Sequence, residues 1–255
     1  MTDQNKDFIE GDKPTEEKQI INVALKDAPV RTITKKELHE TAVERTHHIT
    51  REFTDSFNFL KKFPKSVSFF GGERINEDDP YYEKTRSLAN LIVKRLNYAV
   101  VTGGGRGIME AANMGAAQAG GKSIGLTIEL PNHLIQNAFI NANLNFHYFF
   151  SRKVALAFAA EAYIFLPGGF GTFDEFFEIL TLVQTKKIEA VPIILVGGEF
   201  WRSFDEVIKK EMLTRGTIDE HETSLYTITD DEEEIIQIIQ NAPVRNGIDL
   251  STHTD

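Results

Sequence analysis

The chain has 255 residues, of which 41% are hydrophobic and 26% are charged, enough for one substantial core and a smaller appendage. Its 28 Lys and Arg against 38 Asp and Glu give a net charge of -10, whereas proteins held on nucleic-acid phosphates usually present a basic face. The absence of cysteine excludes disulfides, thiolate catalysis and cysteine-based metal sites. We therefore expect no nucleic-acid partner and no redox role.

The beginning of the chain is polar and acidic, without the apolar core of a signal peptide. No later stretch approaches the ~18 uncharged apolar residues that a membrane-spanning helix needs. From these two observations we expect a cytoplasmic protein without membrane contact.

Residues 1–63 are expected to form a disordered start followed by a helical extension. The first part is rich in Asp, Glu, Lys, Asn and Thr and can bury little. After Thr34, which suits a helix N-cap, apolar residues such as Ile49, Phe53 and Phe57 recur at helical spacing. This amphipathic helix is expected to pack on the main domain or on a second subunit.

Residues 64–241 alternate short apolar runs with helical segments, the order typical of a parallel sheet wrapped by helices. The predicted fold is α/β, a Rossmann-like doubly wound parallel sheet with the N-terminal helical extension, and residues 242–255 are expected to form a polar tail. The predicted strands are 67–70, 99–102, 123–126, 162–166, 191–196 and 226–228, and the predicted helices are 81–96, 108–119, 152–160, 173–184, 200–213 and 231–240.

Three predicted strands end in glycine-rich segments, residues 71–72, 103–107 and 167–172. In an open parallel sheet the ligand lies outside the carboxyl ends of the strands. Glycine there lets N–H groups approach an anion, and the following helix adds the positive end of its dipole. One such loop is equally well explained as a turn, but three at one sheet edge favour a phosphate ligand. Because neither the dinucleotide nor the P-loop spacing is present, dinucleotide cofactors and a kinase-type loop are disfavoured.

Thr172 and Glu175 have the spacing of a helix capping box, and taken alone this structural role is the better explanation. Asp174 and Glu175 nevertheless place two carboxylates on the first turn, at the glycine loop. Both roles can be shared if Thr172 offers its N–H and hydroxyl to phosphate while Glu175 faces the sugar. The apolar residues that this helix is expected to bury are Phe173, Phe176, Phe177 and Leu180.

Arg152 is placed by counting residues. The helix that begins near Ser151 runs antiparallel to the strand that ends at Leu166, and about ten helical residues at ~1.5 Å match about five strand residues at ~3.3 Å. Arg152 therefore lies near the loop at Pro167, where a nucleotide would justify an arginine that opposes the helix dipole. The aromatic run at residues 146–150 is interpreted as core in preference to a wall that stacks on a base.

No metal and no cofactor are predicted. His147 is the one histidine close to these segments, and no spacing of His, Asp and Glu resembles a metal site. Lys153 has the chemistry for a Schiff base with pyridoxal phosphate, but nothing else in the sequence supports that cofactor.

Three segments carry a resemblance to a known family: residues 103–113 (GGGRGIMEAAN), 149–153 (FFSRK) and 167–175 (PGGFGTFDE). With them the chain resembles the LONELY GUY (LOG) family of cytokinin riboside 5'-monophosphate phosphoribohydrolases, often mislabelled lysine decarboxylases. The longer bacterial branch, with an added N-terminal helical region, is the closer likeness. The resemblance implies a purine nucleoside monophosphate as the ligand, AMP or a prenylated adenine nucleotide, and a homodimer or larger homo-oligomer.

The resemblance also implies roles for residues at matching positions. Arg152 corresponds to the family's arginine and Glu175 to its catalytic glutamate. Lys153 and Thr181 match positions near the nucleotide. The further candidates for substrate binding are Gly72, Arg74, Gly103, Gly104, Gly105, Gly168, Gly169, Gly171 and Thr172.

Two positions depart from the family pattern. Glu73 stands where relatives tend to have a small residue such as serine, and Arg106 where proline is common. A carboxylate near the first glycine loop is expected to alter the preference for base or phosphate. Glu129, which follows the third predicted strand, is the candidate for contact with the base.

The expected reaction is hydrolysis of the N-glycosidic bond to free base and ribose 5-phosphate. Because the sugar passes through an oxocarbenium-like state, a carboxylate near C1' stabilises positive charge and orients water, and Glu175 is assigned this role. Arg152 steadies the nucleotide or assists departure of the base. The alternative is a non-catalytic carrier of a nucleotide or of molybdenum cofactor, against which the presence of both charged residues argues.

Overall fold

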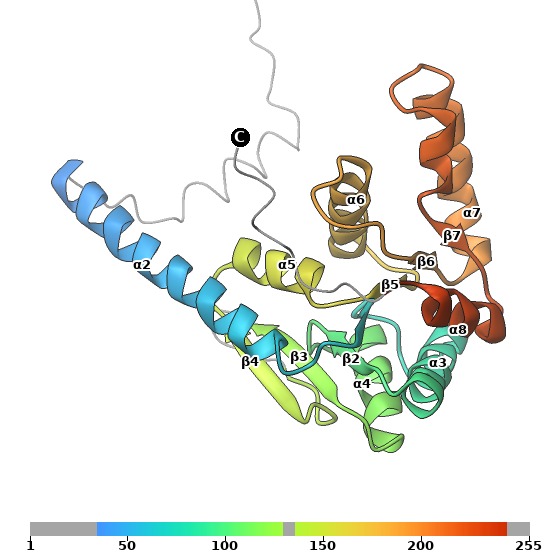
Figure 1. The fold of residues 1–255 in the computed structure, drawn as a ribbon, viewed down its shortest axis with the longest axis horizontal. Helices are drawn as coiled ribbons and strands as arrows, with labels where there is room; N and C mark the ends of the chain where they lie inside the picture. The colour runs from blue at the N-terminus through green and yellow to red at the C-terminus, as the bar shows by residue number, and fades with distance from the viewer. Residues whose placement is uncertain (1–34, 130–135, 244–255) are drawn as a thin grey trace, which may run out of the picture. The chain divides into compact units, whose positions relative to one another are not determined.

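The computed structural model describes residues 35–129 and 136–243, which contain a parallel β-sheet with helices on both faces (Figure 1). The described residues divide between two units, with the boundary after His47 within helix α2. The expected cap at Thr34, the disordered start and the polar tail beyond residue 243 lie outside the described ranges.

The sheet has seven strands in the order β4-β3-β2-β1-β5-β6-β7, and all neighbouring pairs are parallel. This confirms the prediction of a Rossmann-like α/β fold. Strand order reverses between β1 and β5, and in such folds ligands bind beyond the carboxyl ends of the strands at this switch point. The strands are β1 Ser66–Phe70, β2 Ala99–Thr102, β3 Ser123–Ile128, β4 Ala142–Phe146, β5 Ala162–Phe165, β6 Ile193–Leu195 and β7 Thr227–Ile228.

The edge strand β4 is an element that the sequence did not predict. It carries Asn143 and Asn145, and asparagine is depleted in strands because it favours turns. Pairing with β3 along its full length compensates, and Phe146 at its end is buried while Asn145 is exposed. Tertiary pairing therefore outweighs local propensity here.

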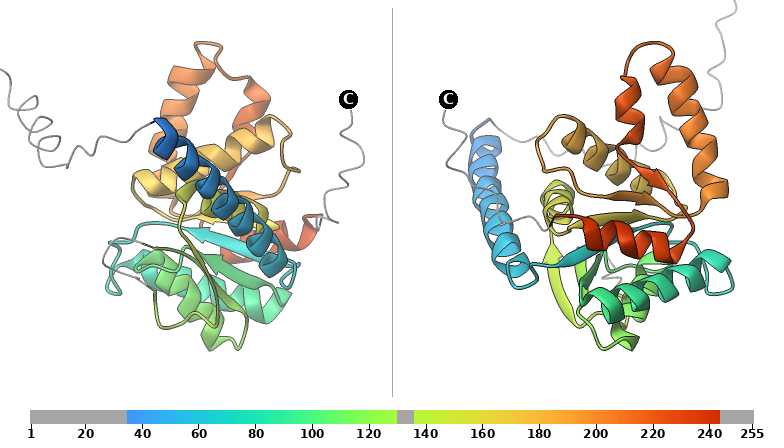
Figure 2. Two further views of the ribbon diagram at one scale, coloured as in Figure 1. Left: turned by 90° about the vertical axis from the view of Figure 1, so that its left-hand side faces the viewer. Right: turned by 45° about the vertical axis from the view of Figure 1, so that its right-hand side comes forward.

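Helices α3, α4 and α8 cover one face of the sheet, and α5, α6 and α7 cover the other (Figures 1 and 2). The division follows from the alternation of side chains along each strand. Tyr163 and Phe165 belong to the hydrophobic cluster beneath α5 and α6, whereas Ile164 and Leu166 belong to the cluster beneath α3 and α4. None of the described helices is long and apolar enough to cross a membrane. The helices are α2 Lys35–Leu60, α3 Pro80–Leu96, α4 Ile108–Gln118, α5 Phe149–Phe158, α6 Phe170–Gln184, α7 Gly198–Val207, the π-helix η1 Ile208–Leu213, the 3₁₀ helix η2 Glu220–Ser224 and α8 Glu232–Asn241.

The second half of α2, from His48, belongs to the same unit as the sheet and packs on α5. The ring of Phe53 lies 6.4 Å from that of Phe150, and the ring of Phe57 lies edge-on to Phe158 at 5.4 Å between centroids. This part of the extension therefore packs on the main domain, one of the two expected arrangements.

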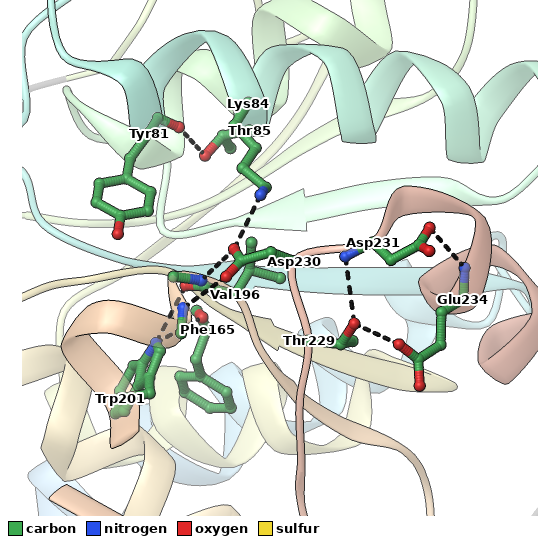
Figure 3. Close-up of polar contacts among 12 residues, drawn as sticks. Tyr81, Lys84, Thr85, Phe165, Val196, Trp201, Thr229, Asp230, Asp231 and Glu234 are labelled. Atoms are coloured by element: carbon green, nitrogen blue, oxygen red, sulfur yellow. Dashed lines mark hydrogen bonds and ion pairs between the residues drawn. The ribbon is translucent and has the colours of Figure 1, made fainter. Parts of the chain in front are cut away.

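The start of α7, at the carboxyl end of β6, is closed by Asp230 (Figure 3). Its carboxylate accepts hydrogen bonds from the N–H groups of Gly197 at 2.9 Å and Gly198 at 2.8 Å, and it pairs with Lys84 at 2.8 Å. Burial acts to raise the pKa of Asp230, but the bonds from Lys84, Gly198 and Gly197 outweigh it, so the pKa is lowered. This helix start is thus already occupied by an anion of the protein itself.

Candidate active site

The first and third glycine loops meet at the switch point between β1 and β5. The N–H of Gly72 donates to the carbonyl of Pro167 at 2.9 Å, and the carbonyl of Gly72 accepts from Ile108 at 3.2 Å. A Cβ on Gly168 would lie 2.9 Å from the nitrogen of Gly72 and 2.1 Å from the hydroxyl of Thr172. Gly72 therefore joins the loops, and its own N–H is engaged by the protein.

The second glycine loop, after β2, needs glycine for its conformation. Gly104 has φ 76° and Gly107 has φ 65°, in the left-handed region that favours glycine. The loop is held by Asn137, which donates from its N–H to the carbonyl of Gly104 and from its side chain to that of Gly105, both at 2.9 Å. Asn137 was not predicted from the sequence, because it lies in an irregular segment where asparagine is common.

Asn137 belongs to a buried amide network beneath this loop. Its side chain also donates to Asn113 at 2.9 Å, and Asn113 accepts from the hydroxyl of Thr102 at 2.7 Å. Thr102 in turn accepts from the N–H of Gly104 at 2.9 Å. Since the polar side chains are buried and bonded to one another, the network fixes the loop firmly.

The helices that follow two of the glycine loops start without a side-chain cap. Gly107 is the N-cap of α4 and Gly169 that of α6, and neither helix start receives a side-chain hydrogen bond. Within the described part of the chain, the N–H groups of residues 105–107 and 168–169 donate to no protein acceptor. Free N–H groups and the positive ends of two helix dipoles at one sheet edge suit an anion such as phosphate.

The capping box expected at Thr172 and Glu175 is wrong. Helix α6 begins at Phe170, so Thr172 is its third residue and is buried against Gly168. The helix starts early because glycine permits the tight approach at Gly168. A Cβ on Gly169 or Gly171 would meet no atom within 4 Å, so the space beside this turn is open.

Arg152 lies in the first turn of α5 and reaches across the second glycine loop. Its Nε donates to the carbonyl of Leu126 at 2.6 Å, and its Nη2 donates to that of Gly103 at 3.2 Å. A Cβ on Gly103 would lie 2.1 Å from Nη2, which explains the glycine at this position. Burial lowers the pKa of Arg152 and Glu175 opposes this, yet no ion pair of Arg152 occurs among the described residues. Its charge is available to a ligand.

Glu175 lies in the second turn of α6, with the carboxylate directed into the protein. Its Oε2 atom is buried and has no hydrogen-bond partner among the described residues. Burial, reinforced by Glu178 and Asp174, raises its pKa to about 7, although Lys153 and Arg152 act in the opposite direction. An unsatisfied buried carboxylate costs free energy, which makes Glu175 the residue most clearly arranged for a ligand.

Lys153 holds α5 against α6. Its Nζ lies 2.8 Å from a carboxylate oxygen of Asp174 and 2.8 Å from one of Glu178. These partners raise the pKa of Lys153 and outweigh the opposing effect of burial. Lys153 therefore acts to lower the pKa of Glu175, while its own Nζ contacts go to Asp174 and Glu178.

Two predicted site residues lie apart from this constellation. Thr181 is exposed and six residues after Glu175, about 9 Å further along the axis of α6. Arg74 is exposed in the loop after β1, and among the described residues neither it nor Thr181 has a polar contact with Arg152 or Glu175. Glu73 and Arg106 are also exposed.

The aromatic run at residues 146–150, which begins at the last residue of β4, is core only in part. Phe146 is buried, but Phe149 is 58% exposed and Phe150 is 47% exposed, so the core interpretation is wrong for these two. They fall on the first turn of α5, where Phe150 lies against Phe53 of α2 and not in the core. Phe177 on α6 is likewise exposed instead of buried.

Glu129 and His147 lie at the carboxyl ends of β3 and β4. Both are exposed, with 3.7 Å between the Glu129 carboxylate and Nδ1 of His147. In the part of the chain that the structure describes, no group of three or more His, Cys, Asp or Glu side chains is arranged to hold a metal ion.

A family model described as "Possible lysine decarboxylase" matches residues 109–239 of the 255-residue chain. The chain belongs to this family, the LOG family. Cytokinin riboside 5'-monophosphate phosphoribohydrolases are among its relatives. One from Arabidopsis thaliana is 24% identical over 193 residues, covering 72% of this chain and 81% of the relative. One from Rhodococcoides fascians is 30% identical over 142 residues, covering 54% of this chain and 71% of the relative.

Solved structures show the same fold as this LOG-family chain. The X-ray structure of TM1055, a structural genomics target, superimposes with a TM-score of 0.52 at 21% identity, over 69% of this chain and 98% of that one. The molybdenum cofactor carrier protein of Chlamydomonas reinhardtii has a TM-score of 0.50 at 19% identity, over 69% of this chain and 96% of that one. At these identities the likeness is one of fold alone.

The LOG-family match covers the charged part of the site. It begins at Met109, within α4, and so includes Arg152 and Glu175, whereas the glycine loops after β1 and β2 precede it. The phosphate-type geometry of those two loops is therefore an observation separate from the family match.

Proposed function

We propose that this chain hydrolyses the N-glycosidic bond of a purine nucleoside 5'-monophosphate, with AMP or a prenylated adenine nucleotide as substrate. One observation carries the proposal. Arg152 and Glu175, on α5 and α6, are electrostatically coupled at the glycine loops, yet Arg152 has no ion pair and Glu175 Oε2 no hydrogen bond among the described residues. Such a pair suits a ligand that carries both negative charge and a centre of developing positive charge.

The 5'-phosphate is assigned to the uncapped starts of α4 and α6. Their free N–H groups and dipoles favour an anion, and the open space beside Gly169 and Gly171 leaves room for one. Gly103, Gly104 and Gly105 shape the second loop, and Gly168 and Thr172 shape the third.

The ionised carboxylate of Glu175 is assigned to the sugar. As the bond between C1' and the base nitrogen breaks, its electron pair leaves with the base and positive charge builds on the ribose. Glu175 stabilises that charge and orients a water molecule, which bonds to C1' and loses a proton. That proton ends on the base nitrogen that took the electron pair, giving free base and ribose 5-phosphate. Arg152 offsets the negative charge on the departing base or on the nucleotide, because its guanidinium has no ion-pair partner among the described residues.

The alternative function is a non-catalytic carrier, since a molybdenum cofactor carrier protein shares the fold. The unsatisfied carboxylate of Glu175 favours hydrolysis, because a carrier of an anionic ligand gains nothing from burying a negative charge beside it. Several exposed aromatic residues support the further proposal of a homo-oligomer.

Product analysis tests the proposal. The purified protein is incubated with AMP and, separately, with isopentenyladenosine monophosphate, and free base is measured by chromatography. Release of base by the wild type, its loss in Glu175→Gln and its retention in Glu206→Gln, an exposed carboxylate on α7, are expected. If AMP binds by calorimetry but no base is released, the protein is a carrier and the proposal fails.

A further inference from the structure

The first turn of α5 is held by a residue of α2. The carboxylate of Glu52 accepts hydrogen bonds from the N–H of His147 at 2.6 Å and of Tyr148 at 3.4 Å, and from the hydroxyl of Ser151. Three donors at one helix start thus converge on one side chain that is distant in sequence. All of these residues belong to the unit that contains the sheet.

Helix α5 has no cap of its own. Its N-cap residue, Tyr148, makes no side-chain capping bond, and its first turn contains no acidic residue. The first turn instead carries Arg152, whose positive charge opposes the dipole at a helix start. The carboxylate of Glu52 instead binds the two N–H groups just before the helix and the hydroxyl of Ser151. It thus caps this helix start from α2, and its negative charge offsets the unfavourable charge of Arg152.

Arg152 depends on this same turn for its position. Its backbone N–H donates to the carbonyl of Tyr148 at 3.2 Å, and it directly follows Ser151. Fraying of the turn would therefore move the guanidinium away from the carbonyls of Leu126 and Gly103 that now orient it.

We propose that Glu52 is a positioning residue for Arg152, so that the helical extension completes the site from outside the sheet. The inference rests on the proposed function only in that Arg152 is assigned a role in the reaction. Two aromatic contacts just after Glu52 hold its helix in place, since Phe53 packs on Phe150 and Phe57 on Phe158.

The chain offers a matched control on the same helix. Asp55, three residues later, is an exposed carboxylate whose partner is Arg51, at 3.7 Å, an exposed pair of the kind that contributes little. Asp55→Asn removes one negative charge from α2 without touching α5. Glu52→Gln removes the same charge but leaves a side chain of nearly the same shape.

Amide hydrogen exchange tests the cap without reference to activity. In Glu52→Gln the amides of His147 and Tyr148 should exchange about tenfold faster than in the wild type, the effect of losing roughly 1.4 kcal/mol of charge-assisted bonding. Asp55→Asn should leave them unchanged. Equal exchange in the wild type and Glu52→Gln overturns the proposal.

A double-mutant cycle tests the link to Arg152. Glu52→Gln should lower kcat/KM about tenfold when Arg152 is present, and by much less in an Arg152→Lys background, because the guanidinium that it positions is gone. Equal losses in both backgrounds would mean a merely structural role and would contradict the proposal. If Glu52→Gln does not fold, Ser151→Ala, which removes one of the three donors, takes its place in both experiments.

The outcomes separate this inference from the proposed function. If the wild type releases no base from either nucleotide, the proposed function fails, and the positioning role fails with it even where hydrogen exchange shows the cap. If the wild type is active and Glu52→Gln matches Asp55→Asn in kcat/KM, only the inference about Glu52 fails.

Discussion

The carboxylate of Glu175 is largely buried, which disfavours its ionised form, yet the proposed mechanism needs that ionised form. Its pKa is raised to about 7, chiefly by burial, so the ionised form becomes abundant only near neutral pH. If the anion stabilises the sugar cation, kcat/KM should rise through pH 7 and level off above it. We expect this rising limb in a profile measured from pH 5 to 9. A profile that falls over this range would assign Glu175 the role of a proton donor and contradict the proposed mechanism.

The same carboxylate should make the wild type less stable at alkaline pH. A carboxyl whose pKa is raised on folding stabilises the folded state below its unfolded pKa near 4.5, and this advantage is lost as pH rises towards 7. Glu175→Gln, which cannot ionise, should therefore exceed the wild type in unfolding free energy by about 2 kcal/mol at pH 8 and differ little at pH 4.5. Urea unfolding at both pH values measures this. If Glu175→Gln is less stable than the wild type at pH 8, the ionised carboxylate of Glu175 makes a stabilising contact in the folded protein, and the expectation is wrong.

At the scale of single elements, a substitution at Gly171 of α6 should change the stability of the protein and its affinity for AMP in opposite directions. This glycine is helical, lies beside open space and has no positive φ. Gly171→Ala should raise the unfolding free energy by about 0.5–1 kcal/mol, because alanine is the better helix former. The added methyl group occupies the space assigned to phosphate, so AMP binding by calorimetry should weaken at least tenfold. Unchanged affinity would show that the phosphate does not bind at this turn.

Elements that follow from local chemistry were predictable from the sequence. The strands that precede the glycine loops are short, mainly apolar runs, and the loops themselves mark the sheet edge where Arg152 and Glu175 were expected. The edge strand β4 was not predictable, because Asn143 and Asn145 argue against a strand and only pairing with β3 overrides them. The capping box at Thr172 misled for a similar reason, since contact with Gly168 decided where α6 begins.

Contacts between residues far apart in sequence were the other gap. Asn137 lies in an irregular segment and Glu52 on the predicted amphipathic N-terminal helix. Neither has a neighbour in sequence that reveals its role. Asn137 bonds to Gly104 and Gly105, and Glu52 bonds to the first turn of α5. Such partners are set by the tertiary packing, which places α2 beside α5.

At the scale of the whole molecule, exposed aromatic residues predict self-association. Phe177 is 38% and Phe204 39% exposed, and both rings contact Phe173, so they form a continuous apolar surface on α6 and α7. Light scattering should therefore give a mass of at least twice that of the 28.8 kDa chain. Phe204→Ser should shift the population towards single chains. A wild type that runs as a single chain would exclude the oligomer.

Asp230 bears on how many phosphate groups the edge of the sheet can bind. Helices α4, α6 and α7 all start there, and the third start is sealed by a carboxylate that is bonded to two backbone N–H groups and to Lys84. A phosphate dianion at the start of α7 would have to displace the carboxylate of Asp230, which is also negatively charged and is part of the chain. The chain should therefore take up one phosphate group and not two, with ribose 5-phosphate titrating to a ratio of one per chain. In this way an exposed acid at the neighbouring helix start directs where along the edge a nucleotide can settle.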